Sequence, residues 1–411
     1  MNAHCRRALI SIALFGLAQP ASADAISDWN EKAVAFGVSR NMGPPPAERI
    51  IAMVHAAMFD AVNSIERRYR PYLVQLPASA TTSKEAAAAT AAGTVLAGIN
   101  PQAQAAMKAA LAAYLKAIPD SPAKLEGVKL GEAIAAKMLE ARANDGARRP
   151  DTYRPRTTAG VYVPTAPTWA PQWPGVKPFA MTSASQFRPV APIALASREW
   201  GDEYNEIKEL GGLASTKRSA RQTEDARFWL AVDGRVYYPV LHKLAAERKL
   251  DLLDSARLFA LTAIARADAL IAVFDAKYHY DFWRPVTAIR NGDIDDNTAT
   301  ERDAAWQPID ATPMHPEYPC AHCIAGASLA GVVEAVFGTP EIPEVSITSP
   351  TLPGVTHRWT DVRAFADEVS HARIWAGFHY RFSTRIGQDM GYKIGAHVVG
   401  NFMQPAGTAS R

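Results

Sequence analysis

The chain has 411 residues, a formal net charge of +3, and 44 basic against 41 acidic side chains. That length allows a large core, built as one large domain or as two closely packed ones. The even charge balance, without a long basic run, argues against nucleic acid as a partner.

The N-terminus has the pattern of a secretory signal. Arg6 and Arg7 precede an apolar run over residues 8–18, and a small-x-small cleavage site ends at Ala23. We expect a signal peptide over residues 1–23, cleaved after Ala23, and a periplasmic or secreted mature protein. No later segment has the pattern of a membrane span.

Apolar residues recur at helical spacing along most of the chain. Helices are predicted over residues 47–65, 84–117 (interrupted near 100), 121–144, 197–210, 217–232, 237–246, 251–283, 323–337, 361–376 and 380–403. The predicted fold class is all-α, a large helical bundle made of two packed helix bundles. In the last helix, Gly387, Gly391 and Gly395 form a bare stripe that allows close contact with another helix.

Residues 150–192 break this pattern, because they hold nine of the 29 prolines. A flexible linker is one interpretation, but the segment also contains Trp169 and Trp173, and disordered segments are poor in aromatic residues. We therefore expect a long, ordered, proline-rich loop packed over the helices. The predicted domains are an N-terminal helical bundle with this loop, 24–195, and a C-terminal helical core, 196–411.

Two basic side chains lie at the C-terminal end of the long helix predicted over residues 251–283. Lys277 and Arg284 are seven residues apart, almost two helical turns, so both leave from one face. Pro285 disfavours helical geometry at Arg284 and places it at the helix end. Two solvated charges would be the ordinary interpretation, but the aromatic surroundings YHYDFW indicate a partly buried setting, where cations need partners.

A second cationic group lies nearer the C-terminus. Arg373 and His379 are six residues apart, a spacing that points them in different directions on one continuous helix. Gly377 lies between them and can end the helix, so that Arg373 closes one helix and His379 opens the next. Alone, His379 would be an ordinary buried histidine.

Between these groups lies the segment HPEYPCAHCIAGASLAGVVEAVF, residues 315–337. A loop with two prolines delivers Cys320, Ala321 and His322 to the start of an apolar helix. Helix starts have free backbone N–H groups and partial positive charge, and they attract anions. Three cations, two histidines and a helix N-terminus together suit a tetrahedral oxyanion such as phosphate or vanadate.

The same residues resemble a known family. Vanadium-dependent haloperoxidases and the related acid phosphatases of the phosphatidic acid phosphatase type 2 (PAP2) superfamily share the pattern K-x6-R-P, P-S-G-H and R-x5-H. In the same order, this chain has Lys277-x6-Arg284-Pro285, Pro319-Cys320-Ala321-His322 and Arg373-x5-His379. The segments DFWRPVTAIR, HPEYPCAH and VHAAMFDAVNSI are similar to the soluble bacterial haloperoxidase-like branch, and the resemblance covers about residues 28–403.

The resemblance implies an all-α double bundle with vanadate as cofactor and phosphate as a competitor for the same site. His379 matches the residue that bonds to vanadium, or that attacks phosphorus in the phosphatases. His322 matches the acid–base histidine. The positions that hold the oxyanion are matched by Lys277, Arg284, Cys320, Ala321, Arg373 and His379.

Three positions depart from the family pattern. Cys320 replaces a serine and Ala321 replaces a glycine. A thiol is a weak hydrogen-bond donor and would oxidise beside peroxide, but Cys323 can protect Cys320 as a disulfide. Ser383 stands where the phosphatases often have an aspartate, which counts against the phosphatase hypothesis.

The first hypothesis is a secreted vanadium-dependent haloperoxidase-like enzyme that oxidises halide with hydrogen peroxide. The alternative is a PAP2-type acid phosphatase that cleaves phosphate esters, with His379 as nucleophile and His322 as general acid. A third hypothesis is an inactive oxyanion-binding protein. The resemblance also allows a homodimer, since related proteins often form one.

Overall fold

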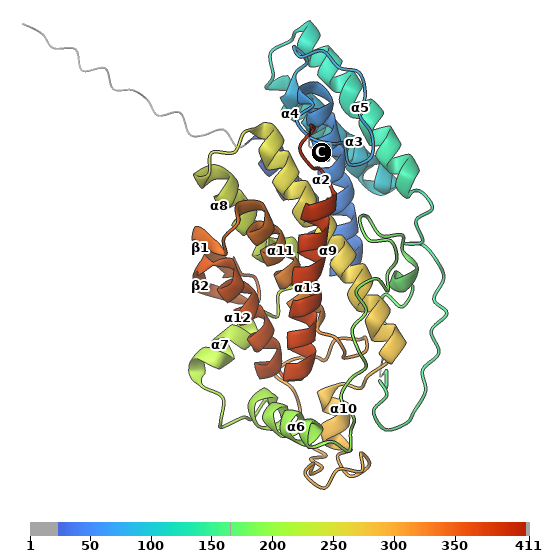
Figure 1. The fold of residues 1–411 in the computed structure, drawn as a ribbon, viewed down its shortest axis with the longest axis vertical. Coiled ribbons are helices and arrows are strands. Elements are labelled where there is room, and N and C mark those ends of the chain that lie inside the picture. Colours follow the sequence, from blue (N-terminus) through green and yellow to red (C-terminus); the bar gives the residue numbers. More distant parts are fainter. Residues whose placement is uncertain (1–23, 165, 408–411) are drawn as a thin grey trace, which may run out of the picture.

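The computed structural model describes residues 24–164 and 166–407, so the predicted signal peptide, residues 1–23, lies outside the described residues. Its helices and strands are shown in Figure 1. In chain order they are α1 (Ala25–Val38), α2 (Pro44–Glu66), α3 (Lys84–Ile99), η1 (Pro101–Ala103), α4 (Gln104–Lys116), α5 (Pro122–Arg142), η2 (Trp173–Gly175), α6 (Arg198–Gly211), α7 (Ala220–Phe228), η3 (Gly234–Val236), α8 (Pro239–Glu247), α9 (Leu252–Tyr280), α10 (Pro285–Arg290), α11 (Ala321–Phe337), β1 (Glu341–Ser349), β2 (Leu352–Asp361), α12 (Val362–Trp375) and α13 (Arg381–Asn401). The predicted all-α class is confirmed, with one small sheet added.

The centre of the fold is α9, which is 29 residues long and buried along most of its length. It packs against α2 on the N-terminal side of the chain and against α11 and α13 on the C-terminal side (Figure 1). One apolar core includes residues from all of these helices. Helices from both parts of the chain therefore pack on the same central helix, and the division into 24–195 and 196–411 stays a prediction.

A buried ion pair joins α2 to α9. Arg266, in the apolar middle of α9, donates to Glu48 of α2 at 2.6 Å, and both side chains are buried. A buried charge is tolerated because it has such a partner. Within the described ranges, no helix combines the length and the apolar character needed to cross a bilayer.

The proline-rich segment is held on α9 by side-chain hydrogen bonds. The Asp268 carboxylate accepts the backbone N–H groups of Phe179, Ala180 and Met181 at 2.6, 2.7 and 2.8 Å. Closer to the end of α9, the Tyr278 hydroxyl donates to the Trp169 carbonyl at 2.6 Å. The described part of this segment is thus an ordered loop packed on the helices, as predicted.

Residues 341–361, most of which lie between the helices predicted over 323–337 and 361–376, form a β-hairpin that the sequence analysis did not predict. β1 and β2 pair antiparallel, with Ile347 opposite His357. Val345, Ile347 and Ser349 are buried while the residues between them are exposed, which is the period-two pattern of a half-buried strand.

The glycine stripe of α13 lies against α11. A Cβ atom would lie 2.6 Å from the Cys320 carbonyl oxygen at Gly387, and 2.6 Å from the Ile324 carbonyl oxygen at Gly391. The predicted close helix contact is therefore confirmed. It sets the first turns of α13 beside the first turn of α11, where the predicted oxyanion site lies.

Candidate active site

The end of α9 and the start of α10 supply two buried cations. Lys277, in the last turn of α9, donates to the backbone carbonyl oxygens of Pro316 and Glu317 at 2.9 and 2.7 Å. Both acceptors lie in the loop that precedes α11, called the central loop below. Arg284 is the N-cap residue of α10, so it lies at a helix boundary, as its position before proline predicted. The prediction that one helix runs to residue 283 and presents Lys277 and Arg284 on one face was wrong, because α9 ends at Tyr280 and Asp281 turns left-handed, with a φ of +54°. It donates to the carbonyl oxygens of His315 and Phe378, both at 2.9 Å. Neither cation forms a salt bridge with a carboxylate of the described residues.

Arg373 and His379 come together because the chain reverses between α12 and α13. α12 ends at Trp375, and Gly377 has a φ of +79°. The backbone N–H groups of Phe378 and His379 both donate to the Arg373 carbonyl, at 3.1 and 3.3 Å. Left-handed glycine geometry is typical of helix C-termini, so the predicted break at Gly377 is confirmed. His379 precedes the first residue of α13 by two positions instead of opening the helix.

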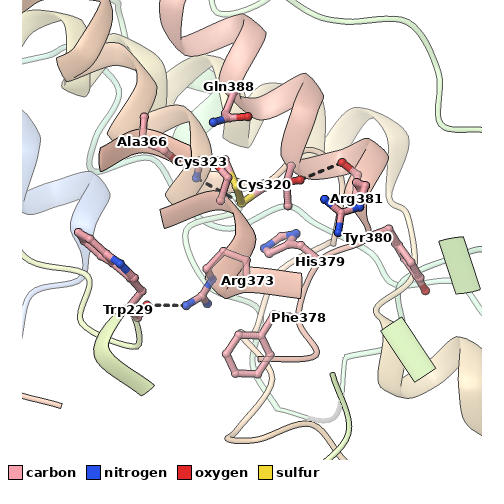
Figure 2. Close-up of a disulfide and its surroundings, with 12 residues drawn as sticks. Trp229, Cys320, Cys323, Ala366, Arg373, Phe378, His379, Tyr380, Arg381 and Gln388 are labelled. Carbon is pink, nitrogen blue, oxygen red and sulfur yellow. Dashed lines mark hydrogen bonds between the residues drawn. A yellow bond between two sulfur atoms is a disulfide. The ribbon is translucent and has the colours of Figure 1, made fainter. Parts of the chain in front are cut away.

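The guanidinium group of Arg373 is only partly satisfied by the chain. It donates to the Trp229 carbonyl at 2.7 Å, while its buried Nε has no hydrogen-bond partner. Figure 2 shows Arg373 and His379 next to each other near the disulfide between Cys320 and Cys323. A free, buried donor beside His379 is suited to an anionic ligand.

Glu317 orients His379, and the sequence analysis did not single it out. His379 Nδ1 lies 2.7 Å from Glu317 Oε1, and its Nε2 lies 3.2 Å from Nη1 of Arg284. Because an arginine can only donate, the hydrogen bonds assign the proton to Nδ1 and the lone pair to Nε2. Burial raises the pKa of Glu317 to about 7, against the lowering effect of Lys277 and Arg284. An acidic residue between the two prolines of an otherwise apolar loop was the signal that could have revealed it.

The central loop ends at Cys320, the N-cap residue of α11, so that Ala321 and His322 are the first residues of the helix. His322 Nε2 is buried and has no hydrogen-bond partner. Cys320 and Cys323 form a disulfide. No free thiol therefore faces the site, which removes the main chemical objection to peroxide beside Cys320.

The pKa values of these side chains reflect cations held out of water. Burial lowers the pKa of Arg284 to about 10 and that of Arg373 to about 9. Burial, followed by repulsion from Arg284, lowers the pKa of Lys277. Burial and the nearby cations also lower the pKa values of His322 and His379, so both imidazoles are neutral at pH 7. A bound anion would reverse these shifts.

A cavity of about 330 Å³ opens beside this cluster. Ala321, His322, Arg373 and His379 are among its lining residues, together with Arg266, Asp310 and His315. Lys277, Arg284 and Cys320 do not line it, although Arg284 contacts His379. The remaining walls are largely apolar and include Trp169, Leu230, Leu270, Phe274 and Phe378.

Comparison with known proteins agrees with this architecture. Residues 257–407 match the family described as the VCPO second helical-bundle domain. The vanadium chloroperoxidase of Curvularia inaequalis is 29% identical over 169 residues, which is 34% of this chain and 27% of that protein. The chain thus spans about a quarter of the length of this curated relative.

Solved structures resemble nearly the whole chain. A bacterial vanadium-dependent iodoperoxidase superposes with a TM-score of 0.78 at 22% identity, over 94% of this chain and 98% of the other. The apo and holo forms of a bacterial vanadium-dependent chloroperoxidase give TM-scores of 0.68 and 0.67 at 18% identity, over 87% of this chain and 94% and 92% of theirs. At such identities the likeness defines the fold alone.

The fold is therefore that of the helical vanadium haloperoxidases, and it carries a buried cationic cluster at the start of a helix. The family model matched over residues 257–407 and the vanadium chloroperoxidase match make the chain similar to the vanadium haloperoxidases in sequence as well as in fold.

Proposed function

We propose that this protein is a vanadium-dependent haloperoxidase, which uses hydrogen peroxide to oxidise a halide at a vanadate held by His379. The observation that carries the proposal is the set of three buried cations around a neutral histidine: Lys277, Arg284 and Arg373 form no salt bridge with a carboxylate in the described part of the chain. Such a set has a use only when an external anion neutralises it.

The residues fit vanadate in number and chemistry. His379 would bind vanadium through Nε2, because Nδ1 is engaged with Glu317. Lys277, Arg284 and Arg373 would bind the oxygen atoms, and the buried Arg373 Nε is a donor without another partner. The bound vanadate would supply the activation of peroxide that halide oxidation requires.

The side chains would contribute preorganised charge and one mobile proton. The three cations are fixed to backbone carbonyls, so they need little rearrangement to stabilise negative charge. His322, with an unpartnered and neutral Nε2, would accept and return a proton. The apolar walls of the cavity would keep bulk water from the reacting atoms.

The test is halogenation of a phenol dye by purified protein with orthovanadate, hydrogen peroxide and iodide or bromide. We expect His379→Ala to reduce the rate by about a hundredfold or more. His397→Gln is the matched control, because His397 lies on α13 but does not line the cavity, and it should keep the wild-type rate.

Three other results would contradict the proposal. A wild-type rate equal to that of His379→Ala would exclude catalysis at this site. Hydrolysis of p-nitrophenyl phosphate without halogenation would favour the phosphatase alternative, with His379 as nucleophile. Vanadate binding without either reaction would favour an inactive oxyanion-binding protein.

We also propose that the protein is exported and that its signal peptide is cleaved after Ala23. N-terminal sequencing of protein recovered from the periplasm or the medium should then begin at Asp24. A chain that stays in the cytoplasm with its first 23 residues would contradict export.

A further inference from the structure

A second cluster of ionisable side chains lies outside the oxyanion site and joins three elements. Glu224 and Asp225 are on α7, His357 is on β2 and Glu368 is on α12. One oxygen or nitrogen atom from each of Glu224, Asp225 and His357 lies within 4.8 Å of the others. These atoms are close enough to share a single cation.

The orientation of His357 leaves one ring nitrogen free. The ring is 2% exposed and stacks on Phe228, with centroids 3.9 Å apart. Its Nδ1 lies 2.6 Å from Glu368 Oε1, whereas its buried Nε2 has no hydrogen-bond partner and lies 3.4 Å from Glu224 Oε1. With the proton held on Nδ1 by Glu368, the Nε2 lone pair faces Glu224. A carboxylate on the opposite ring nitrogen is the usual support of a metal-binding histidine.

The cluster also has excess negative charge. Arg221 is its one basic side chain, 2.8 Å from both Glu224 and Asp225, and it is 58% exposed. Apart from the imidazole, three carboxylates and one guanidinium group give a net charge of −2. A divalent cation would neutralise this net negative charge.

We propose that Glu224, Asp225 and His357 bind a zinc ion, with water in the remaining position and Glu368 orienting the histidine. One imidazole nitrogen and two carboxylates form a ligand set that Zn²⁺ accepts, whereas Ca²⁺ and Mg²⁺ prefer oxygen ligands only. Arg221 leaves the carboxylates and extends into solvent when zinc binds.

The site has a structural connection to the cationic cluster. Glu368 Oε1 also accepts the indole N–H of Trp229 at 3.0 Å, and the Trp229 carbonyl accepts a hydrogen bond from Arg373. A zinc ion that fixes α7 against β2 and α12 thus holds in place the residue that positions Arg373. The zinc site itself does not depend on what the oxyanion site does.

The experiment is a titration of the chelator-treated full protein with Zn²⁺ by calorimetry, together with elemental analysis after dialysis. We expect one zinc ion per wild-type chain and loss of this ion in His357→Gln. Glu368→Gln should weaken binding by about 10–100-fold, because it removes the support of the imidazole. Arg221→Ala should bind zinc more tightly, since it removes the competing cation.

Glu344→Gln is the matched control, because Glu344 is an exposed carboxylate on the same hairpin, paired with Arg358, and it should bind zinc like the wild type. Glu224→Gln provides a second test if His357→Gln does not fold, since the Glu224 side chain is 37% exposed. Equal zinc uptake by the wild type, His357→Gln and Glu224→Gln would overturn the proposal.

Discussion

Two arginines line the same cavity under opposite electrostatic conditions. Arg266 and Arg373 are both almost fully buried. Burial opposes the charge of Arg266, but its ion pair with Glu48 outweighs burial and raises the pKa of the arginine above its usual value. Arg373 forms no salt bridge within the described residues, and burial lowers its pKa to about 9.

This difference indicates that the charge of Arg266 stabilises the fold, whereas the charge of Arg373 is available to bind a ligand. Arg266 has its counter-charge inside the chain, on Glu48, and the pair joins α9 to α2. The Nε of each arginine lacks a hydrogen-bond partner among the described residues, but Arg373 also lacks a counter-charge there and therefore lowers the stability of the unliganded protein. Such a cost is typical of binding sites, where residues are selected for function at the expense of stability.

The largest expected effect comes from breaking the internal pair. Glu48→Gln leaves Arg266 as a buried charge without a counter-charge, and we expect the free energy of unfolding to fall by about 3–5 kcal/mol. Urea denaturation measures this loss. Glu140→Gln, which breaks an exposed pair with Lys137, should change stability by less than about 1 kcal/mol. If Glu48→Gln lowered the free energy of unfolding by less than about 1 kcal/mol as well, the ion pair of Arg266 would not stabilise the fold.

Phosphate should supply the negative charge that the cationic cluster of Lys277, Arg284 and Arg373 lacks. At a hundred times its Kd, phosphate should raise the free energy of unfolding by about 2.7 kcal/mol. A bound anion raises the lowered pKa values of Arg373 and Lys277, so binding takes up protons and must weaken as pH rises. Denaturation with phosphate, or with chloride at the same ionic strength, should show this effect shrinking from pH 8 to pH 10. An effect that grows with pH would contradict the assignment of charged donors.

Removing the unpaired charge should have the opposite sign to Glu48→Gln. Arg373→Met takes away a desolvated cation, and we expect the phosphate-free protein to gain about 1–3 kcal/mol, reduced by the lost hydrogen bond to Trp229. The same variant should no longer bind phosphate by calorimetry. Lower stability together with retained phosphate binding would show that Arg373 serves the fold as Arg266 does.

The smallest expected effect tests how the helices position the cations. An alanine Cβ at residue 387 would lie 2.6 Å from the Cys320 carbonyl oxygen, so Gly387→Ala must shift α13 away from the start of α11. We expect a loss of about 1 kcal/mol in stability and weaker phosphate binding. Gly400→Ala, with no atom within 4 Å of the added Cβ, should instead gain about 0.5–1 kcal/mol and bind phosphate normally. Equal effects of the two substitutions would contradict the close contact.

Much of the fold was predictable because its helices are long and strongly periodic, and because the cations occur in short motifs. The β-hairpin was not predicted, since its period-two pattern is short and lies between helical patterns. Partners that are distant in sequence were also missed. Glu317 and His379 are 62 residues apart, and Glu48 and Arg266 are 218 apart, so composition and spacing gave no reason to pair them.

The attachment of the proline-rich loop has a consequence for how this scaffold can diversify. Asp268 and Tyr278 tether the loop to α9, and Trp169 on that loop forms part of the cavity wall, with its ring against Phe274. The cations, in contrast, belong to helix termini and the short connections between them. The cavity wall can therefore be reshaped by exchanging the Trp169 side chain, while the cations keep their positions.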